Sequence, residues 1–446
     1  MTRITVARLP VDPGPAGWNA ILPAAPAARM LEGAQRAEWL VIGAGFAGLS
    51  AAHRLSRLCP GDDIVVVEAA RVASGPGGRN SGFMIDLPHD LASSDYGGAP
   101  EADRALTQDN RHAIAYAAQM AADFGLSDQA FAPTGKINGA ASAKGHQHNL
   151  DYARHLAALG EPYELMDRAA MQALTGTSYY RSGLYTAGTA MIQPAAYLRG
   201  IAEGMVSNRL RLFENTPVTA LERRGDWCAT TPKGRVSAPN VILAVNGHLN
   251  SFGFLKNQLM HVFTYASMTR PLSPQEQRAL GGAPIWGLTP ADPMGTTVRR
   301  IASAQGPRIV VRNRFTYDPT LEVSEARIQA VAQDHDRAFA ARFPMLGGVT
   351  MDYRWGGRLC LSRNNVSVVQ ELEPGLFAAC CQNGLGTTRG TLSGILAAEL
   401  ATGTASPQLT RALQAPPPRK LPPAFVMKPA ARAVLRWQER QAGDEL

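Results

Sequence analysis

Three closely spaced glycines in the run Trp-Leu-Val-Ile-Gly-Ala-Gly-Phe-Ala-Gly, residues 39–48, could bind a phosphate group. Gly43 permits a tight turn, Gly45 lets the backbone approach a pyrophosphate, and Gly48 lets the following helix pack closely on a sheet. The free N–H groups and the positive dipole at the start of that helix would then face the phosphates. Twenty residues later a second apolar run ends at Glu68, whose carboxylate could accept hydrogen bonds from a ribose. This pattern predicts a site for the ADP half of a dinucleotide.

The elements that must position these residues are a strand over residues 38–43, a helix over 46–58 and a second strand over 63–68. A Gly-x-Gly-x-x-Gly run alone is weak evidence, but here strand, glycine turn, helix and acidic residue follow in the required order. Four further residues near the turn and after the second strand are expected at the cofactor: Phe46, Ala47, Ala69 and Arg71.

The residues after Glu68 favour FAD over other dinucleotides. A carboxylate at this position disfavours the 2′-phosphate of NADP. Residues 73–84 form a glycine-dense loop that could fold back over an extended cofactor, where a plain NAD domain would continue into a helix. We expect Arg79 near the pyrophosphate as a charge-assisted donor. Ser81 and Gly82 would let the chain run close to a flat ring. The loop contacts also include Gly78 and Asn80.

The run Gly-Gly-Arg-Asn-Ser-Gly, residues 77–82, resembles the second glycine motif of the D-amino-acid-oxidase-like flavoprotein superfamily. This superfamily includes glycine oxidase, sarcosine oxidase and γ-glutamylputrescine oxidase, and the pattern here is closest to the last branch. The loop departs from the common Gly-Ala-Ser-Gly-Arg-Asn-Gly-Gly form at Pro76-Gly77 and at Ser81. Residues 193–198, 241–247 and 382–390 resemble later family segments in the same order. The resemblance covers roughly residues 37 to 405.

The resemblance implies an α/β fold, in which a Rossmann-like FAD-binding domain is interleaved with an α+β substrate domain built on a mixed β-sheet. A chain of 446 residues is long enough for two such domains. The expected parts are an N-terminal arm (1–36), the FAD-binding domain (37–100, 191–256 and 350–412), the substrate domain (101–190 and 257–349) and a C-terminal tail (413–446). Trp18 is expected to pin the arm to the surface, and the tail is either a docked helix or an oligomer contact.

The resemblance also implies the remaining cofactor contacts. The backbone of Val218, in a short strand over residues 217–221, is expected to meet the adenine. Cys360 lies in the segment where some relatives attach the flavin to a cysteine, but its spacing matches poorly, so we expect non-covalent FAD. The other expected contacts are Asn246, Gly247, Gly357, Asn383, Gly384, Leu385, Gly386 and Thr387.

Charged and polar residues of the predicted substrate-domain strands are the candidates for binding substrate. Arg312 and Arg314 lie two apart in a strand over residues 308–315, so both should face the same side. They could clamp a carboxylate or sulfonate, and two solvent-facing arginines are the alternative. His261 and Tyr265 lie four apart in the preceding strand and could face the flavin, although a structural role for the histidine is simpler.

Other side chains could line the same cavity. Trp286, Tyr317 and Trp355 are candidate walls, with core packing as the alternative. Asp86 and His89 follow the flavin loop directly and could line the entry, although hydrogen bonding to nearby backbone is the more ordinary role.

The composition argues against several classes of protein. The net charge of +8 comes mostly from arginine, and no basic run is dense enough to mark a nucleic-acid site, although the charge could steer an anionic substrate. No apolar run reaches the roughly 18 residues of a membrane span. Five cysteines without metal-binding spacing, and no secretion signal, predict reduced thiols, no metal site and a cytoplasmic protein.

A flavin accepts a hydride from a carbon that bears an amine or a hydroxyl group. The resemblance implies the first reaction, in which a C–N bond of an amine or amino acid is oxidised to an imine that hydrolyses to a carbonyl product. The electrons would pass to O2 or to a carrier partner, and the sequence does not distinguish these. Two alternatives stay open: oxidation of a hydroxy acid or polyol, and a flavin-bearing subunit of a larger dehydrogenase complex.

Overall fold

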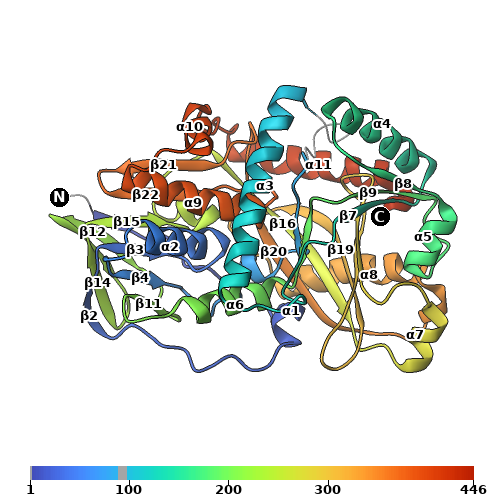
Figure 1. Cartoon of the computed structure of the whole chain (residues 1–446), viewed down its shortest axis with the longest axis horizontal. Helices are drawn as coiled ribbons and strands as arrows, with labels where there is room; N and C mark the ends of the chain where they lie inside the picture. Colours follow the sequence, from blue (N-terminus) through green and yellow to red (C-terminus); the bar gives the residue numbers. More distant parts are fainter. Residues whose placement is uncertain (1–2, 89–97) are drawn as a thin grey trace.

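The computed structural model describes residues 3–88 and 98–446. The fold is built around two large β-sheets (Figure 1). His89 lies outside the described residues. The first sheet is parallel except for its last strand, which pairs antiparallel with its neighbour. Its order is β11 (Leu210–Phe213), β4 (Ile64–Val67), β3 (Trp39–Ile42), β15 (Asn240–Leu243), β22 (Leu376–Cys380) and β21 (Val368–Glu373).

Strands β3 and β4 are buried on both faces, which explains their unbroken apolar sequences. On one face, Val41 and Val66 pack with helices α2 (Phe46–Leu58) and α9 (Thr388–Thr402). On the other face, Leu40 and Val65 pack against a smaller sheet. That sheet has the order β1 (Arg3–Thr5), β12 (Ala220–Arg224), β13 (Asp226–Thr230), β14 (Gly234–Ala238) and β2 (Gly33–Arg36). The predicted first strand, helix and second strand are confirmed to within one residue at each end.

The second large sheet has eight strands, and helix α8 (Glu325–Arg342) packs on it through Ile328 and Val331, which contact Phe263 and Tyr265. Its order is β20 (Met351–Ser362), β16 (Leu259–Thr269), β19 (Arg308–Tyr317), β18 (Thr297–Ile301), β17 (Trp286–Pro290), β7 (Lys136–Ala140), β9 (Ser182–Thr186) and β8 (Glu164–Met166). The predicted α/β fold with a second, mixed sheet is therefore confirmed.

The two large sheets take their strands from alternating parts of the chain, so segments far apart in the sequence lie side by side (Figure 1). One feature differs from the expected division. Strand β20 pairs with β16 from Met351 to Ser362, so it belongs to the eight-stranded sheet, although the FAD-binding domain was expected to resume at residue 350. The other domain boundaries stay predictions.

Residues 3–36 are paired to the five-stranded sheet at both ends. Strand β1 pairs with β12, and β2 pairs with β14, so both complete the edges of the five-stranded sheet. Between them the chain crosses to the middle of the molecule, where the short helix α1 (Gly17–Ala20) lies (Figure 1). Trp18 in this helix is fully buried, as expected, and its Nε1 donates to the carbonyl oxygen of Asn80 at 2.8 Å.

Helix α10 (Pro407–Gln414) leads into the C-terminal tail, whose helix α11 (Ala424–Ala442) is docked on the eight-stranded sheet. Leu435 and Ala442 of α11 pack with Phe315 and Tyr317 of β19. Within residues 3–88 and 98–446, no helix has the length and apolar character that crossing a bilayer requires.

Candidate functional site

A cavity of about 970 Å³ lies where the carboxyl ends of β3, β4 and β15 face strands β16, β19 and β20. Its volume is at the upper end of the range of about 300–1,000 Å³ that is usual for ligand pockets. The predicted cofactor contacts line this cavity with three exceptions: Gly48, Gly78 and Gly82. These three shape the loops around it, because a Cβ at any of them would lie within 2 Å of a neighbouring atom.

The glycine turn between β3 and α2 has the geometry that its sequence predicts. Gly43 has a φ of +105°, and a Cβ there would lie 2.6 Å from the carbonyl oxygen of Ala244. A Cβ on Gly48 would lie 1.7 Å from the carbonyl oxygen of Gly43, so the helix can approach the turn only without a side chain. Gly45 differs, because a Cβ there would meet no atom within 4 Å. The space in front of the N-terminus of α2 is therefore open to a ligand.

The carboxylate of Glu68 is fixed at the end of β4. It accepts hydrogen bonds from the backbone N–H groups of Ala44 at 2.8 Å and Ala70 at 3.1 Å. Burial raises the pKa of Glu68, and the charges of Asp12 and Glu214 act in the same direction against the lowering effect of the two backbone donors. A hydroxyl donor at this site would relieve the buried negative charge, as a ribose does in dinucleotide domains.

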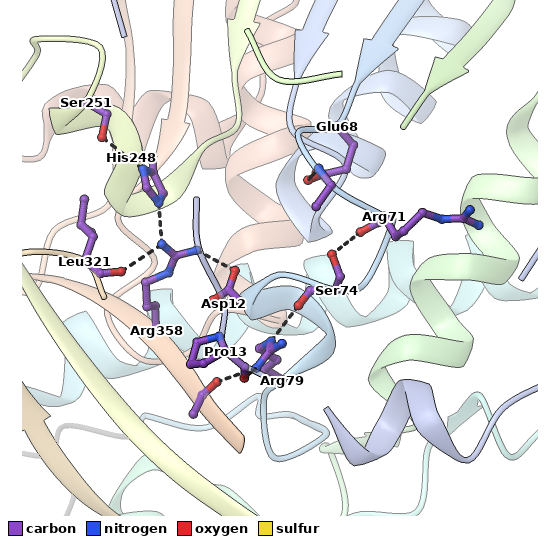
Figure 2. A network of polar contacts seen from close by, with 12 residues as sticks. Asp12, Pro13, Glu68, Arg71, Ser74, Arg79, His248, Ser251, Leu321 and Arg358 are labelled. Atoms are coloured by element: carbon purple, nitrogen blue, oxygen red, sulfur yellow. Dashed lines mark hydrogen bonds and ion pairs between the residues drawn. The ribbon is translucent and has the colours of Figure 1, made fainter. Parts of the chain in front are cut away.

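Arg79, the predicted donor to a pyrophosphate, lines the cavity, and its guanidinium bonds to carbonyl oxygens of the chain (Figure 2). Its Nε donates to the carbonyl oxygen of Ser74 at 2.7 Å, and its Nη atoms donate to the carbonyl oxygens of Pro13 and Gly14. The reason is burial: the residue is 4% exposed, and a buried guanidinium needs acceptors, which the N-terminal segment supplies. Asn80 also bonds within its own loop, to Gly77 and Gly82.

A second buried arginine, Arg358 of β20, was not predicted. Figure 2 shows its guanidinium between Asp12, His248 and the carbonyl oxygen of Leu321. Its Nη2 lies 2.9 Å from Asp12 Oδ2, and its Nη1 lies 2.5 Å from His248 Nε2 and 3.2 Å from the Leu321 oxygen. The position directly after Gly357, an expected cofactor contact, was the available sequence signal for Arg358, but nothing in the sequence pointed to Asp12.

The strands of the eight-stranded sheet supply another part of the cavity wall, where a substrate was expected. Arg312 of β19 lines it, and the hydroxyl-bearing residues Thr264, Thr289 and Thr297 lie on the wall with it. The guanidinium of Arg312 also lies 4.7 Å from the ring centroid of Phe315. A cation among hydroxyl groups suits an anionic group of a substrate.

Arg314 does not share this wall, so the expectation that both arginines face one side is wrong. The pairing of β16 with β19 shifts between Thr264 and Tyr265, which leaves Arg314 as the extra residue of a bulge with a φ of +59°. A bulge breaks the two-residue alternation of a strand. Arg314 therefore binds Asp334 at 2.8 Å and Glu439 at 3.0 Å, away from the cavity.

Two other predicted site residues also lie behind the cavity wall. Tyr265 packs against α8, and its hydroxyl bonds to Thr316 Oγ1 at 2.6 Å. Trp355 is fully buried, and its Nε1 donates to the carbonyl oxygen of Arg79 at 3.1 Å. Neither side chain lines the cavity. Trp286 and Tyr317 do not line the cavity and lie in packed hydrophobic clusters, as the alternative of core packing predicts. Asp86 does not line the cavity either, but its carboxylate binds Arg111 at 3.0 Å and Thr189 Oγ1 at 3.2 Å rather than nearby backbone.

Most of the chain matches one known protein family. Residues 38–400 match the family described as DAO, FAD dependent oxidoreductase. The chain belongs to this family. Probable oxidoreductase OrdL of Rhizobium meliloti is 25% identical over 412 residues, which cover 88% of this chain and 90% of that protein. Gamma-glutamylputrescine oxidoreductase of Escherichia coli is 25% identical over 373 residues, which cover 82% and 83%.

Solved structures of the DAO fold superpose on most of the chain. Glycine oxidase from Geobacillus kaustophilus has a TM-score of 0.66 and 17% identity, with 84% of this chain and 96% of that chain covered. Iminodiacetate oxidase from Chelativorans sp. BNC1 has a TM-score of 0.63 and 16% identity, with 86% and 98% covered. At these sequence identities the structural similarity establishes the fold alone.

The residues of the cavity fit the FAD on which the DAO family depends. The open space before Gly45 and the helix N-terminus behind it suit a pyrophosphate, and Glu68 suits a ribose. At the other end, Asn383, Gly384, Leu385 and Thr387 line the cavity just before α9. Thr387 Oγ1 donates to the carbonyl oxygen of Phe83 at 2.6 Å, which joins this segment to the second glycine loop. The contacts of individual residues with FAD stay predictions.

Val218 and Cys360 are two further residues that were expected near the cofactor in the DAO-family cavity. Val218 lines the cavity, but β12 begins at Ala220, so Val218 precedes the strand rather than lying in it. Cys360 also lines the cavity, and a hydrogen bond with Cys381 together with burial raises the pKa of its thiol. A thiol held protonated is a poor nucleophile, which agrees with the expectation of non-covalent FAD.

Arg299 of β18 is a contact that sequence reasoning missed. It is 6% exposed, and its Nη1 donates to the carbonyl oxygens of Gly82 at 2.9 Å and Ile192 at 2.7 Å. Burial lowers the pKa of Arg299 to about 10. The guanidinium also lies over the rings of Trp18 and Phe83. It therefore fixes the second glycine loop from behind, and no sequence motif distinguishes it from the neighbouring Arg300.

Two neutral histidines lie near Arg358. His261 lines the cavity, and its Nε2 is 2.9 Å from Asn250 Oδ1. Burial, and then the charge of Arg358, lowers the pKa of His261 to about 4 and that of His248 to about 3. Both side chains are therefore hydrogen-bond acceptors at neutral pH.

These histidines should make the folded protein less stable at acidic pH. From about pH 4 to pH 6.5 the unfolded chain binds more protons than the folded chain at these sites, so the free energy of unfolding rises with pH across this window. We expect the melting temperature to fall as the pH is lowered from 6.5 towards 4. Thermal melts of the apoprotein at constant ionic strength would measure this, and His261→Gln should reduce the slope. An unchanged slope in the variant would contradict the assignment.

Proposed function

We propose that the protein oxidises the C–N bond of an amine or amino acid to an imine, which hydrolyses to a carbonyl product. Bound FAD would supply the acceptor for the two electrons, which then pass to O2 or another acceptor. The contribution of the chain is to place the substrate. When the protein holds the substrate with its C–H bond toward the flavin, a reaction between two molecules becomes effectively unimolecular, which lowers the entropic part of the barrier.

The observation that carries the proposal is the position of Arg312 in a DAO-family cavity. Its guanidinium, with the hydroxyl groups of Thr264 and Thr297 on the same wall, suits a carboxylate at a fixed distance from the reacting carbon. The names of related proteins point the same way, since gamma-glutamylputrescine, glycine and iminodiacetate all carry an amine nitrogen and a carboxylate. We therefore expect an anionic amine or amino acid as substrate.

Oxidation of a hydroxy acid is the second candidate, and His261 is the observation in its favour. Its Nδ1 is buried without a partner in the described residues, so this atom could accept a proton. A base with a pKa of about 4, however, drives proton abstraction from a hydroxyl group poorly at neutral pH. An amine can enter neutral and needs no strong base, so the structure supports amine oxidation better.

Anaerobic mixing of the FAD-loaded protein with candidate substrates tests the proposal. Amines or amino acids should bleach the flavin band near 450 nm, about the wavelength that this cofactor absorbs, and matched hydroxy acids should not. Bleaching by hydroxy acids alone would overturn it in favour of the second candidate. Bleaching by neither would support a flavin-bearing subunit that needs a partner. Peroxide formed on admitting air would identify O2 as the acceptor.

A further inference from the structure

Residues 6–29 are the part of the N-terminal arm between strands β1 and β2, and only this part is called the arm below. The arm forms part of the cavity wall. Its residues on the wall include Arg8, Asp12, Gly14, Asn19, Pro26 and Arg29. The family match begins at residue 38, so the arm lies outside the part of the chain that defines the family. Its two flanks are fixed as strands of the five-stranded sheet, and the arm spans the distance between them.

One half of the arm follows the adenine end of the cavity. The carbonyl oxygen of Pro26 accepts a hydrogen bond from Arg71 Nη2 at 2.5 Å, and that of Arg29 accepts one from the backbone N–H of Glu214 at 2.9 Å. Both partners lie on the cavity wall beside Glu68. The arm therefore passes directly over the place where the adenosine half of the cofactor is expected.

The other half follows the second glycine loop. Asn19 Nδ2 donates to the carbonyl oxygen of Ala73 at 2.6 Å, and the Arg79 guanidinium holds the carbonyl oxygens of Pro13 and Gly14 (Figure 2). The arm thus runs along the cavity from the adenine end to the loop expected at the flavin. An extended cofactor would lie beneath it for much of its length.

Asp12 is the side chain through which the arm reaches across to the opposite wall. Its carboxylate is 10% exposed and forms an ion pair with Arg358 of β20 at 2.9 Å, and the Arg358 side chain is 6% exposed. The second oxygen, Oδ1, is buried and has no partner in the described residues. A buried charge that loses its partner is strongly destabilising. Breaking this contact should therefore cost much more free energy than breaking an exposed ion pair.

We propose that the arm is a binding element for FAD, closed over the bound cofactor by the Asp12–Arg358 ion pair. Cofactor release then requires that this pair separate and the arm lift from the loop that contains Ala73 and Arg79. The free Oδ1 of Asp12 is placed to accept a hydrogen bond from a sugar hydroxyl of FAD after a small shift, and a phosphate would be repelled there. The proposal holds for either candidate substrate.

Asp12→Ala tests the role of the arm in holding FAD. The variant should release FAD at least about tenfold faster than the wild type, because it leaves Arg358 without its partner and the arm without its closure. The rise in flavin fluorescence after a large dilution, or gel filtration at set times, measures release without any turnover. Glu32→Ala is the matched control, since it removes the exposed ion pair of Glu32 with Lys233, 3.4 Å long, outside the cavity.

Equal release rates for Asp12→Ala and the wild type would overturn the proposal, and so would an equal effect of Glu32→Ala. If Asp12→Ala does not fold, the wild type still provides a test. Limited proteolysis should cut within residues 6–29 faster in the apoprotein than in the FAD-loaded protein. Equal cleavage in the two forms would overturn the proposal. ADP and FMN, tested as separate ligands of the apoprotein, would tell which sugar Asp12 contacts: weaker binding of ADP to Asp12→Ala assigns the ribose, and weaker binding of FMN assigns the ribityl chain.

Discussion

Replacing Gly45 with valine will leave the chain folded and remove its ability to bind FAD. A Cβ at this position meets no protein atom within 4 Å, and the backbone at Gly45 has φ −87° and ψ −168°, which any residue can adopt. The added side chain would fill the space before the N-terminus of α2, where the pyrophosphate must approach the backbone. We expect FAD affinity to fall at least about 100-fold, equivalent to about 2.7 kcal/mol.

Two measurements separate cofactor loss from misfolding. Thermal melts of the apoprotein should be the same for Gly45→Val and the wild type, whereas flavin fluorescence titration should show the lost affinity. Gly61→Val is the control, because Gly61 also has free space around its Cβ but lies in an exposed turn away from the cavity. Normal FAD binding by Gly45→Val would mean that the glycine turn is not the pyrophosphate site.

Replacing Arg312 with glutamine will raise KM for an anionic amine substrate by roughly 100-fold, because truncating one partner of a buried charged pair costs about 2–5 kcal/mol. The change in kcat should be small if Arg312 binds the substrate equally well throughout the reaction. FAD affinity should not change, since Arg312 lies on the eight-stranded sheet and not among the predicted cofactor contacts. Steady-state kinetics with an amine and with the same amine lacking its carboxylate would measure the effect, which should disappear for the second compound.

Arg314 provides the matched control for this experiment. Arg314→Gln removes the ion pairs with Asp334 and Glu439, so it should lower the melting temperature and leave KM unchanged. A larger change in KM for Arg314→Gln than for Arg312→Gln would show that the bulge does not separate the two side chains in solution. Equal KM values for Arg312→Gln and the wild type would remove Arg312 from the substrate site.

The first strand, glycine turn, helix and second strand could be predicted from the sequence because each depends on neighbouring residues. Buried parallel strands need unbroken apolar runs, and the close approach of α2 to Gly43 needs glycine at position 48. The FAD cofactor and the fold class followed from these motifs and from the family resemblance. Segments expected at the flavin, such as residues 382–387, also reach the cavity.

The substrate side was harder to predict because it depends on contacts between distant strands. The bulge at Arg314 moves one residue out of the alternating pattern, and no local signal in Arg-Asn-Arg-Phe marks it. Tyr265 and Trp355 have the residue types of a cavity wall, but Tyr265 packs against helix α8 and Trp355 bonds to the loop of Arg79. The ion pair of Asp12 with Arg358 joins residues 346 positions apart, which no periodicity reveals.

The cavity wall begins in the arm at Val6 and ends at Gly390, at the start of α9. During translation, the β22–α9 segment that completes the site is made more than 300 residues after the glycine turn. The nascent chain must therefore keep the apolar strands β3 and β4 from aggregating before β15 and β22 arrive to pair beside them. A complete FAD site therefore forms only after β22 and α9 have joined the earlier strands, so the cofactor meets a sheet that is already assembled.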